Sequence, residues 1–302
     1  MSASGVSENA RGGGASDDGI TVLPSRQMTN PWDFGEAKPP QEPMGFLTDS
    51  TLCIGCKACE VACKQWNQLP ADGMNVGANP DGLKMSGNSY DNTGHLGSET
   101  WRHVKFLENF DASREESKWF FMSDVCKHCQ DAGCLNACPT GAIIRTEFDT
   151  VYVQDDICNG CGFCIPSCPF GVIGRAESDG GAHKCTLCYD RQEGGMEPAC
   201  AKSCPTDSII FGPLSEMRER AQRRVEELRE RGMTVHMYGD SEELAGGLNS
   251  LFILPDTPEK LGLPTTARTG KHNLKFSYGG HLLVGLAWAG LAAAALARHR
   301  GP

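Results

Sequence analysis

The chain has 302 residues, with 28 Lys or Arg against 38 Asp or Glu, and its formal net charge is therefore -10. A nucleic-acid-binding face needs an excess of positive charge, so no nucleic-acid partner is expected. Sixteen cysteines are several times the usual share, yet a chain of this length can bury one or two ordinary cores and does not need disulfides to hold it together.

Residues 1–45 are expected to form a disordered tail. They are rich in Gly, Ser, Pro and Asp and contain few large apolar side chains. Such a composition cannot bury enough surface to offset the entropy lost on folding. The tail has no apolar segment of the kind found in a signal peptide, and Arg11 and Arg26 stand alone, so it contains no twin-arginine pair.

The cysteines form four groups of four, and the first begins the stretch CIGCKACEVACKQWN at Cys53. The first and third groups have two, two and three residues between their cysteines. The middle gap widens to four residues in the second group and to eleven in the fourth. The groups are Cys53, Cys56, Cys59 and Cys63; Cys126, Cys129, Cys134 and Cys138; Cys158, Cys161, Cys164 and Cys168; and Cys185, Cys188, Cys200 and Cys204.

Between the first two groups, an insertion is expected over about 68–124. It contains Gly- and Asn-rich loops and ends in two strand-like stretches, WRHVKFLENF and KWFFMSD. The insertion serves either as a structural wing around the cysteine groups or as a docking surface for a partner protein. Composition alone does not separate these two roles.

After the fourth group, a helical and extended segment is expected over 213–275. It opens with LSEMRERAQRRVEELRERG, which predicts an amphipathic helix that ends near Gly232. Glu stands four positions before Arg three times, an orientation that stabilises a helix and leaves these arginines paired. The apolar stripe is Leu214, Met217, Ala221, Val225 and Leu228, and the pairs are Glu216 with Arg220, Glu219 with Arg223, and Glu227 with Arg231.

The C-terminal stretch FSYGGHLLVGLAWAGLAAAALARHR predicts a transmembrane helix over 276–298. Residues 276–297 include 22 positions without Asp, Glu, Lys or Arg. At about 1.5 Å per residue, a helix of this length spans the roughly 30 Å of a bilayer core. A buried helix of a soluble protein is the alternative. Lys and Arg flank the span on both sides, so the positive-inside rule does not set its orientation.

The spacing of the cysteine groups is that of bacterial ferredoxins. Three thiolates hold one 4Fe-4S cluster, and the fourth, which precedes Pro, binds the other cluster of a pair. Pro139, Pro169 and Pro205 follow the last cysteine of three groups, and Lys64 stands there in the first. Zinc ribbons are the alternative for paired cysteines, but they would leave the third and fourth cysteine of each compact group without a role.

Four groups therefore predict four 4Fe-4S clusters in two pairs. We treat the adjacent second and third groups as one ferredoxin-like unit and the first and fourth as the other, and exchange the fourth cysteine within each pair. Cluster 1 is then held by Cys53, Cys56, Cys59 and Cys204; cluster 2 by Cys63, Cys185, Cys188 and Cys200; cluster 3 by Cys126, Cys129, Cys134 and Cys168; and cluster 4 by Cys138, Cys158, Cys161 and Cys164.

Several charged residues stand beside these cysteines. A lysine whose ammonium lies close to a cluster raises the reduction potential of that cluster. The alternative is an ordinary surface lysine. Both interpretations stay open for each of these lysines. His128 is expected to be a surface residue or one that supports the ligands, not a ligand. The lysines are Lys57, Lys64, Lys127, Lys184 and Lys202.

The motifs resemble the iron-sulfur (beta) subunit of membrane-bound formate dehydrogenase, within the four-cluster subunits of molybdenum or tungsten oxidoreductases. The likeness rests on CIGCKACEVACKQWN, CKHCQDAGCLNACPTGAI, CNGCGFCIPSCPFGVI and KCTLCYDRQEGGMEPACAKSCPTDSI, and it runs from about Gly45 to the C-terminus. Related nitrate reductase subunits replace one cysteine with Trp, which argues against them. Dimethyl sulfoxide or polysulfide reductase subunits keep the cysteines, but the KQWN ending and the long C-terminal segment favour formate dehydrogenase.

The resemblance implies an electron-transfer subunit that receives electrons from a formate-oxidising molybdopterin alpha subunit, containing Mo or W. Such a subunit passes them to a cytochrome b gamma subunit in the membrane, which reduces quinone. The resemblance also implies that the cluster domain lies outside the cytoplasm. No nucleotide loop, nucleophile elbow or HExxH motif is present, so no catalytic residue is predicted. A free-standing polyferredoxin and a zinc-stapled interaction protein are the alternatives from other classes.

The expected fold is α+β, with two ferredoxin-like double-cluster cores, an insertion and a C-terminal transmembrane helix. Metal binding is expected to supply much of the folding free energy of the cores. The predicted divisions are the tail over 1–45, a four-cluster domain over 46–212, the C-terminal extension over 213–275 and the transmembrane helix over 276–298.

Overall fold

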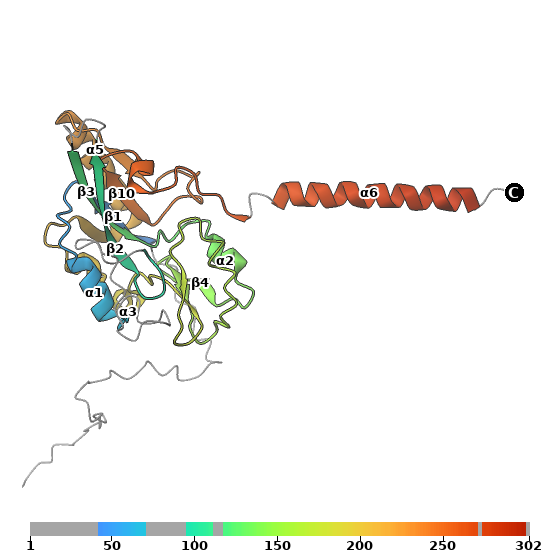
Figure 1. Cartoon of the computed structure of the whole chain (residues 1–302), viewed down its shortest axis with the longest axis horizontal. Helices are drawn as coiled ribbons and strands as arrows, with labels where there is room; N and C mark the ends of the chain where they lie inside the picture. Colours follow the sequence, from blue (N-terminus) through green and yellow to red (C-terminus); the bar gives the residue numbers. More distant parts are fainter. Residues whose placement is uncertain (1–41, 71–94, 111–116, 271–273, 300–302) are drawn as a thin grey trace, which may run out of the picture. The chain divides into compact units, whose positions relative to one another are not determined.

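The computed structural model describes residues 42–70, 95–110, 117–270 and 274–299 (Figure 1). Short strands and helices alternate along them, which confirms the mixed α+β content. The predicted tail falls almost wholly outside the described residues, as do 71–94 of the predicted insertion. The strands are β1 Met44–Asp49, β2 Arg102–Phe110, β3 Ser117–Val125, β4 Ile143–Arg145, β5 Val151–Val153, β6 Gly174–Arg175, β7 Ala182–His183, β8 Ile209–Pro213, β9 His236–Tyr238 and β10 Ser250–Leu254. The helices are α1 Ala58–Trp66, α2 Gly133–Ala137, α3 Tyr189–Glu193, α4 Ala199–Lys202, α5 Leu214–Glu230, η1 Pro258–Leu261 and α6 Leu274–His299.

A four-stranded sheet in the order β8-β1-β10-β9 joins distant parts of the chain. β1 pairs antiparallel with β8 and parallel with β10, and β9 is antiparallel to β10. Thr48 near the end of β1 lies opposite Ile209 at the start of β8. Because β1 precedes the first cysteine group and β8 follows the fourth, the sheet brings these two groups to the same end.

Helix α5 packs against this sheet as an amphipathic helix. Its buried residues are the five predicted ones, and they form a small core with Leu47 of β1 and with Leu251 and Ile253 of β10. Gly232 follows the helix with a φ of 81°, in the left-handed region that glycine favours. All three predicted Glu–Arg pairs are present. The predicted helix and its buried stripe are thus confirmed.

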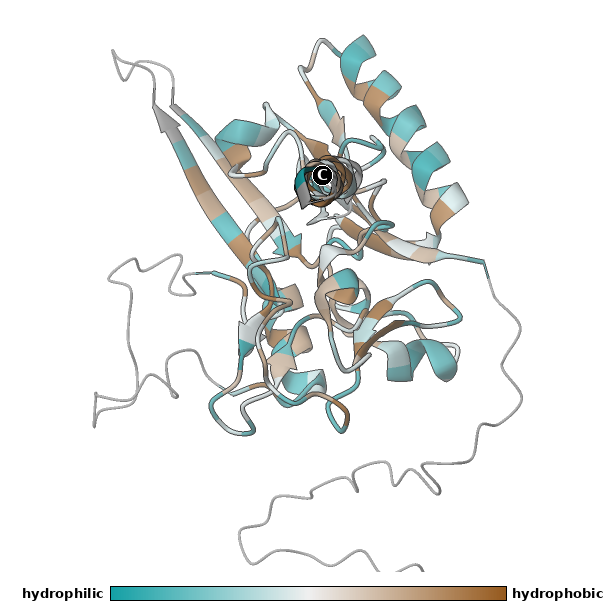
Figure 2. Ribbon diagram, turned by 90° about the vertical axis from the view of Figure 1, so that its right-hand side faces the viewer, coloured by the Kyte–Doolittle hydropathy of each residue, from teal (hydrophilic) through white to brown (hydrophobic). Residues whose placement is uncertain are grey.

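Strands β2 and β3 form an antiparallel hairpin of nine paired positions from Arg102 opposite Val125 onward. Hydrophobic and hydrophilic residues succeed each other along it (Figure 2). Phe106 and Phe121 pack edge to face with 4.9 Å between ring centroids, and Trp119 lies against both. The hairpin confirms the two strand-like stretches predicted at the end of the insertion.

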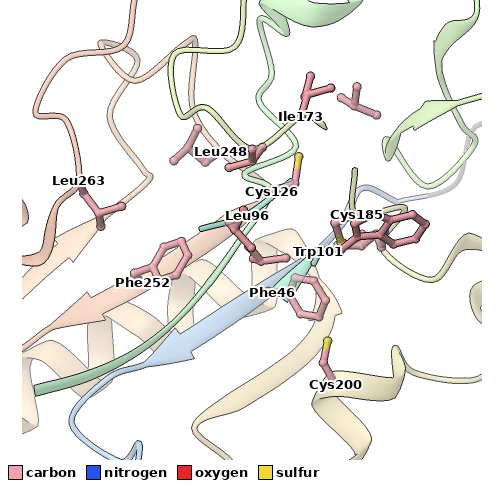
Figure 3. Close-up of a cluster of buried hydrophobic side chains, with 14 of the residues drawn as sticks. Phe46, Leu96, Trp101, Cys126, Ile173, Cys185, Cys200, Leu248, Phe252 and Leu263 are labelled. Atoms are coloured by element: carbon pink, nitrogen blue, oxygen red, sulfur yellow. The ribbon is translucent and has the colours of Figure 1, made fainter. Parts of the chain in front are cut away.

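The main hydrophobic core contains many of the cysteines. Cys126, Cys185 and Cys200 lie within it among aromatic and aliphatic side chains such as Phe46 and Trp101 (Figure 3). Two small hairpins, β4–β5 and β6–β7, follow the second and third cysteine groups. The cysteine groups therefore lie on loops and short helices around this core.

Helix α6 has 26 residues, and its end carries the C-terminal label in Figure 2. The segment Ser277–Leu296 is the one part of the described chain that is long and apolar enough to cross a membrane. Large apolar side chains in it, including Leu282, Trp288 and Leu291, are exposed. The helix is therefore a candidate membrane span, and it is not the buried helix of a soluble core.

Candidate iron-sulfur cluster sites

All sixteen cysteines lie within the described residues, and none of them forms a disulfide. Most are buried or half-buried, whereas Cys56 and Cys161 are exposed. Across the described ranges, no three His, Cys, Asp or Glu side chains converge closely enough to hold a metal ion. The tight tetrahedral grouping that a zinc site requires is thus not found in the part of the chain that the structure describes.

One cavity is lined by Cys126, Cys129, Cys134 and Cys168. Three of these cysteines come from the second group and one from the third, which is the set predicted for cluster 3. Helix α2 explains the exchange, because Cys134 lies in it and Cys138 follows its end. One helical turn therefore separates two sulfurs that are predicted to bind different clusters.

A second cavity is lined by Cys53, Cys56, Cys59 and Cys204, the set predicted for cluster 1. The sheet accounts for this convergence, since β1 ends just before the first three cysteines and β8 begins just after the fourth. In helix α1, Cys59 and Cys63 are one turn apart, so this helix repeats the arrangement at α2.

The cysteines predicted for cluster 2 also lie together. Burial raises the pKa of the Cys63 thiol well above its ordinary value, and the nearby thiolates of Cys200, Cys185 and Cys188 raise it further. Cys63 comes from α1, and the other three cysteines of the set come from the fourth group. The structure therefore brings this set together although more than a third of the chain separates its members.

The cysteines predicted for cluster 4 also lie close enough together that three of them raise the pKa of the remaining one, Cys164. Burial raises the pKa of Cys164 to about 11; a backbone hydrogen bond opposes the shift, and Cys158, Cys138 and Cys161 add to it. The backbone N–H of Ala182 in β7 donates to Cys158 Sγ at 3.4 Å. Hydrogen bonds of this kind to sulfur are among the determinants of cluster potential.

The electrostatic environment of the cysteine ligands suits an iron-sulfur cofactor. Burial raises the pKa of Cys59 and of Cys134 to about 12 in each case. Because the thiolate and not the thiol is the metal ligand, these buried groups need a nearby positive charge in order to ionise. The iron of a bound cluster supplies that charge, and binding and folding are coupled in this way.

The same turn is built in all four groups, at the residue before the second cysteine. Gly55, His128, Gly160 and Leu187 have φ values of 68°, 47°, 69° and 56°, all in the left-handed region. This turn directs successive sulfurs toward one point. Two of the four positions carry glycine, the residue for which this conformation is unstrained, whereas His128 and Leu187 adopt it at a cost that the surrounding packing must offset.

Gly160→Ala is expected to impair the cluster 4 site more than Gly162→Ala. Both glycines have positive φ, 69° and 78°, which costs an alanine roughly 1–2 kcal/mol. An added Cβ at Gly160 also lies 2.2 Å from the Gly180 carbonyl oxygen, whereas at Gly162 the nearest atom is 3.8 Å away. Iron content after anaerobic purification should fall by about a quarter in Gly160→Ala alone. Equal losses in both variants would mean that the turn conformation decides, not the clash.

Lys127 and Lys184 are each only 1% exposed and line the cavity of cluster 3. Lys127 forms an ion pair with Asp124. Lys184 donates to the carbonyl oxygens of Val151 and Cys185, the latter at 2.9 Å. The surface interpretation is therefore wrong for these two lysines, and their positive charges would act on a cluster bound in this cavity.

The other three lysines occupy different environments. Lys57 pairs with Glu60 at 3.4 Å, and Lys64 donates to the carbonyl oxygen of Glu99 at 2.9 Å. Lys202 is largely exposed and pairs with Glu197. The surface interpretation thus holds for Lys202, while Lys64 ties the end of α1 to the segment before the β2–β3 hairpin.

His128 is buried at the cluster 3 cavity. This excludes the surface position and leaves the other expectation, a residue that supports the ligands. Burial holds the pKa of its imidazole well below the ordinary value, and the positive charges of Lys184 and Arg145 lower it further. The ring is therefore neutral. Its place in the left-handed turn before Cys129 fits a residue that shapes the loop.

Arg102 and Ser123 are two further residues at the cluster 1 site, and no sequence motif marks them. Arg102 begins β2 and is buried, and its Nη1 donates to Ser123 Oγ at 3.0 Å. Ser123 Oγ in turn lies 3.3 Å from Cys59 Sγ. Both residues belong to the hairpin and are far from any group-one cysteine in sequence, so no local motif marks them; only the pairing of β2 with β3 reveals the contact.

Two family models, both described as 4Fe-4S dicluster domains, match the chain over residues 52–142 and 117–214. Together these matches include all four cysteine groups. With sixteen cysteines and two dicluster domains, the chain has four 4Fe-4S clusters, and a subunit with such a set of clusters transfers electrons.

Curated relatives match most of the chain. The iron-sulfur subunit of the nitrate-inducible formate dehydrogenase of Escherichia coli strain K12 is 41% identical over 223 residues, which cover 72% of this chain and 71% of that protein. The formate dehydrogenase iron-sulfur subunit of Haemophilus influenzae is 40% identical over 72% of this chain and 67% of its own length. The B subunit of the anaerobic dimethyl sulfoxide reductase of Escherichia coli strain K12 is 34% identical over 58% of this chain and 76% of its own length. By the identity and coverage of these matches, the chain belongs to the family of formate dehydrogenase iron-sulfur subunits.

Proposed function

We propose that the chain relays electrons through four clusters bound by the exchanged cysteine sets predicted above. The observation that carries this proposal is the pair of cavities, each lined by three cysteines of one group and one of another. Each bound cluster accepts and passes on one electron at a time. The protein's task is to hold the sulfurs at fixed positions and to shield them from water.

The four sites lie in series from cluster 1 to cluster 4. Helix α1 carries Cys59 and Cys63 and so connects the sites of clusters 1 and 2. Burial raises the pKa of Cys185, and the next largest effect is that of the Cys126 thiolate, which supports close contact between the sites of clusters 2 and 3. Helix α2, with Cys134 inside it and the next group-two cysteine after it, connects the sites of clusters 3 and 4.

The two ends of this series are open to solvent. Cys56 at the cluster 1 site and Cys161 at the cluster 4 site are exposed. Next to them, the side chains of Ile54 and Phe163 are also exposed. Exposed apolar groups of this kind favour contact with partner proteins. We infer that electrons enter at one end of the series and leave at the other.

The proposed donor is a catalytic molybdopterin subunit with Mo or W that oxidises formate. Support comes from the relatives named as formate dehydrogenase subunits, which match more of the chain at higher identity than the dimethyl sulfoxide reductase relative does. The proposed acceptor is a cytochrome b subunit in the membrane. A reductase partner of the dimethyl sulfoxide type is the second candidate, and its support is the 34% identical reductase subunit.

Reduction by formate tests the proposed donor. The intact complex, purified anaerobically from membranes, is examined by electron paramagnetic resonance before and after formate is added. We expect formate to reduce the clusters. If only dithionite reduces them and dimethyl sulfoxide reoxidises them, the relay function stands and the donor assignment gives way to the second candidate.

Helix α6 is proposed as a membrane anchor, with the cluster domain over 46–212 and its extension over 213–275 on one side of the membrane. Family resemblance implies that this side is outside the cytoplasm. Support for the anchor comes from the length, composition and exposed apolar side chains of Ser277–Leu296. Strands β9 and β10 of the extension pair into the same sheet as β1.

Ending the chain after Gly270 is expected to release it from membranes. The truncation leaves the sheet and all cysteines intact, and burial of about 20 apolar residues in the bilayer is lost. Fractionation of cells that express the truncated chain without its partners should place it in the soluble fraction with its clusters. Recovery in the membrane fraction, as for the full-length chain, would contradict an anchor in α6.

A further inference from the structure

Arg102 is an unusual residue in the described structure because its guanidinium is buried without a carboxylate. Its side chain is 1% exposed and ranks among the largest fully buried side chains. The guanidinium carbon lies 4.7 Å from the centroid of the Phe46 ring, and Nη1 donates to Ser123 Oγ. Both contacts are with neutral groups.

The rest of the guanidinium lacks a partner among the described residues. Nε and Nη2 of Arg102 make no hydrogen bond in that part of the structure, and no Asp or Glu there pairs with the side chain. Burying a charge without a counter-charge costs several kcal/mol. The neighbouring buried cation, Lys127, has Asp124 for this purpose, so the charge of Arg102 must be balanced by something else.

Cysteine sulfurs, which become thiolates when they bind a cluster, are the groups around Arg102 that can carry negative charge. Ser123 Oγ, which accepts from Arg102, lies 3.3 Å from Cys59 Sγ. Phe46, whose ring faces the guanidinium, belongs to the same buried core as Cys63, Cys185 and Cys200. The electrostatics agree with these contacts: burial lowers the pKa of Arg102, and Cys200, Cys59, Cys185 and Cys63 together raise it above the ordinary value. Cys59 belongs to the set of cluster 1, and the other three belong to the set of cluster 2. The charge therefore lies between two cluster sites.

We propose that Arg102 is a positioned counter-charge shared by clusters 1 and 2, which raises the reduction potential of both. Reduction adds one electron, and hence one negative charge, to a cluster. A fixed positive charge close by stabilises that reduced form. Because the guanidinium stays protonated, no proton moves. One side chain thus acts on two successive steps of the relay, an inference that rests on the ligand sets of the proposed function.

The test is a redox titration with mediators, followed by electron paramagnetic resonance, on the intact complex purified from membranes. Arg102→Met removes the charge and keeps much of the side-chain volume. At a fixed potential, the ratio of reduced to oxidised cluster should fall at least tenfold for clusters 1 and 2, and tenfold corresponds to about 59 mV for a one-electron couple. Clusters 3 and 4 should be unaffected.

Two control variants separate charge from packing. Arg102→Lys keeps a positive charge and is expected to leave both potentials close to the native values, which a purely structural role would not predict. Arg224→Met removes an arginine of α5 that is already paired with Asp49 at 3.0 Å, and it should shift no potential. The signals of clusters 1 and 2 are assigned with the Cys59→Ser and Cys200→Ser variants.

The proposal is overturned if Arg102→Met retains four clusters with native potentials, or if the Met and Lys variants shift equally. If Arg102→Met does not take up its clusters, Arg102→Gln provides the same test, because it removes the charge and keeps a hydrogen-bond donor toward Ser123. That variant should lower both potentials, and unchanged potentials would overturn the proposal. Mediators make the titration independent of formate, so the result stays valid even if the proposed electron donor is wrong. If the proposed ligand sets are wrong, Cys59→Ser and Cys200→Ser should both lose the same signal.

Discussion

Replacing Cys168 with Ser is expected to eliminate cluster 3, although Cys168 belongs to the third cysteine group. The reason is the cavity in which Cys168 joins three cysteines of the second group. Iron content should fall by about a quarter, and electron transfer from the proposed formate-oxidising donor to the proposed cytochrome b acceptor should be lost because the series of sites is interrupted. Electron paramagnetic resonance should show the change seen in Cys129→Ser.

The matched variant is Cys138→Ser. Cys138 belongs to the second group but is predicted to bind cluster 4. Its spectrum should resemble that of Cys161→Ser, not that of Cys129→Ser. If instead each variant altered the signal of its own sequence group, the exchange of fourth cysteines would be wrong. The four spectra together therefore decide between exchanged and unexchanged ligand sets, whatever the electron donor is.

Asp124→Ala is expected to lower the free energy of unfolding by about 3–5 kcal/mol, the usual cost of leaving one partner of a buried ion pair alone. Burial raises the pKa of the Asp124 carboxyl, but the charges of Lys127 and Lys105 outweigh it and hold that pKa well below its usual range. Without the carboxylate, the ammonium of Lys127 stays buried against the ring of Phe252 at 4.6 Å. Faster loss of cluster absorbance in urea, recorded anaerobically, measures the effect.

The control removes both charges. Asp124→Leu combined with Lys127→Met replaces the pair with apolar side chains and should recover most of the stability, because no uncompensated charge is left. Lys105 reaches solvent, with 26% of its side chain exposed, so it does not need the carboxylate. Equal loss rates in the single and double variants would show that Asp124 acts through its shape and not through its charge.

Local patterns predicted the elements whose partners are near in sequence. The apolar stripe of α5 from Leu214 to Leu228 has a helical period, and the structure buries those residues. The strand-like character of the hairpin follows from residues such as Val104 and Phe121, which pack on a pleated surface. The cysteine spacing likewise predicted clusters, because three of the four ligands of each compact site lie within a few residues.

Contacts between distant segments could not be predicted in this way. No pattern in Leu251 or its neighbours indicates that β10 lies beside β1, since a short apolar strand has many possible partners. Lys184 and Lys202 look alike in sequence, each close to a cluster cysteine, yet one is buried and the other exposed. Arg102 is far in sequence from the thiolates that face it, and only the tertiary fold brings them together.

The order of strands in the sheet also constrains how the protein is made. β1 emerges early from the ribosome, but its neighbours β8 and β10 lie at Ile209–Pro213 and Ser250–Leu254. The sheet beside the first cysteine group is therefore complete only after most of the polypeptide has been synthesised. The loop of the second cysteine group also depends on late residues, because the backbone N–H groups of Gln130 and Asp131 donate to the carbonyl oxygens of Gly247 and Ala245. Neither of these two sites can thus take its final shape before the chain has been synthesised through Leu254.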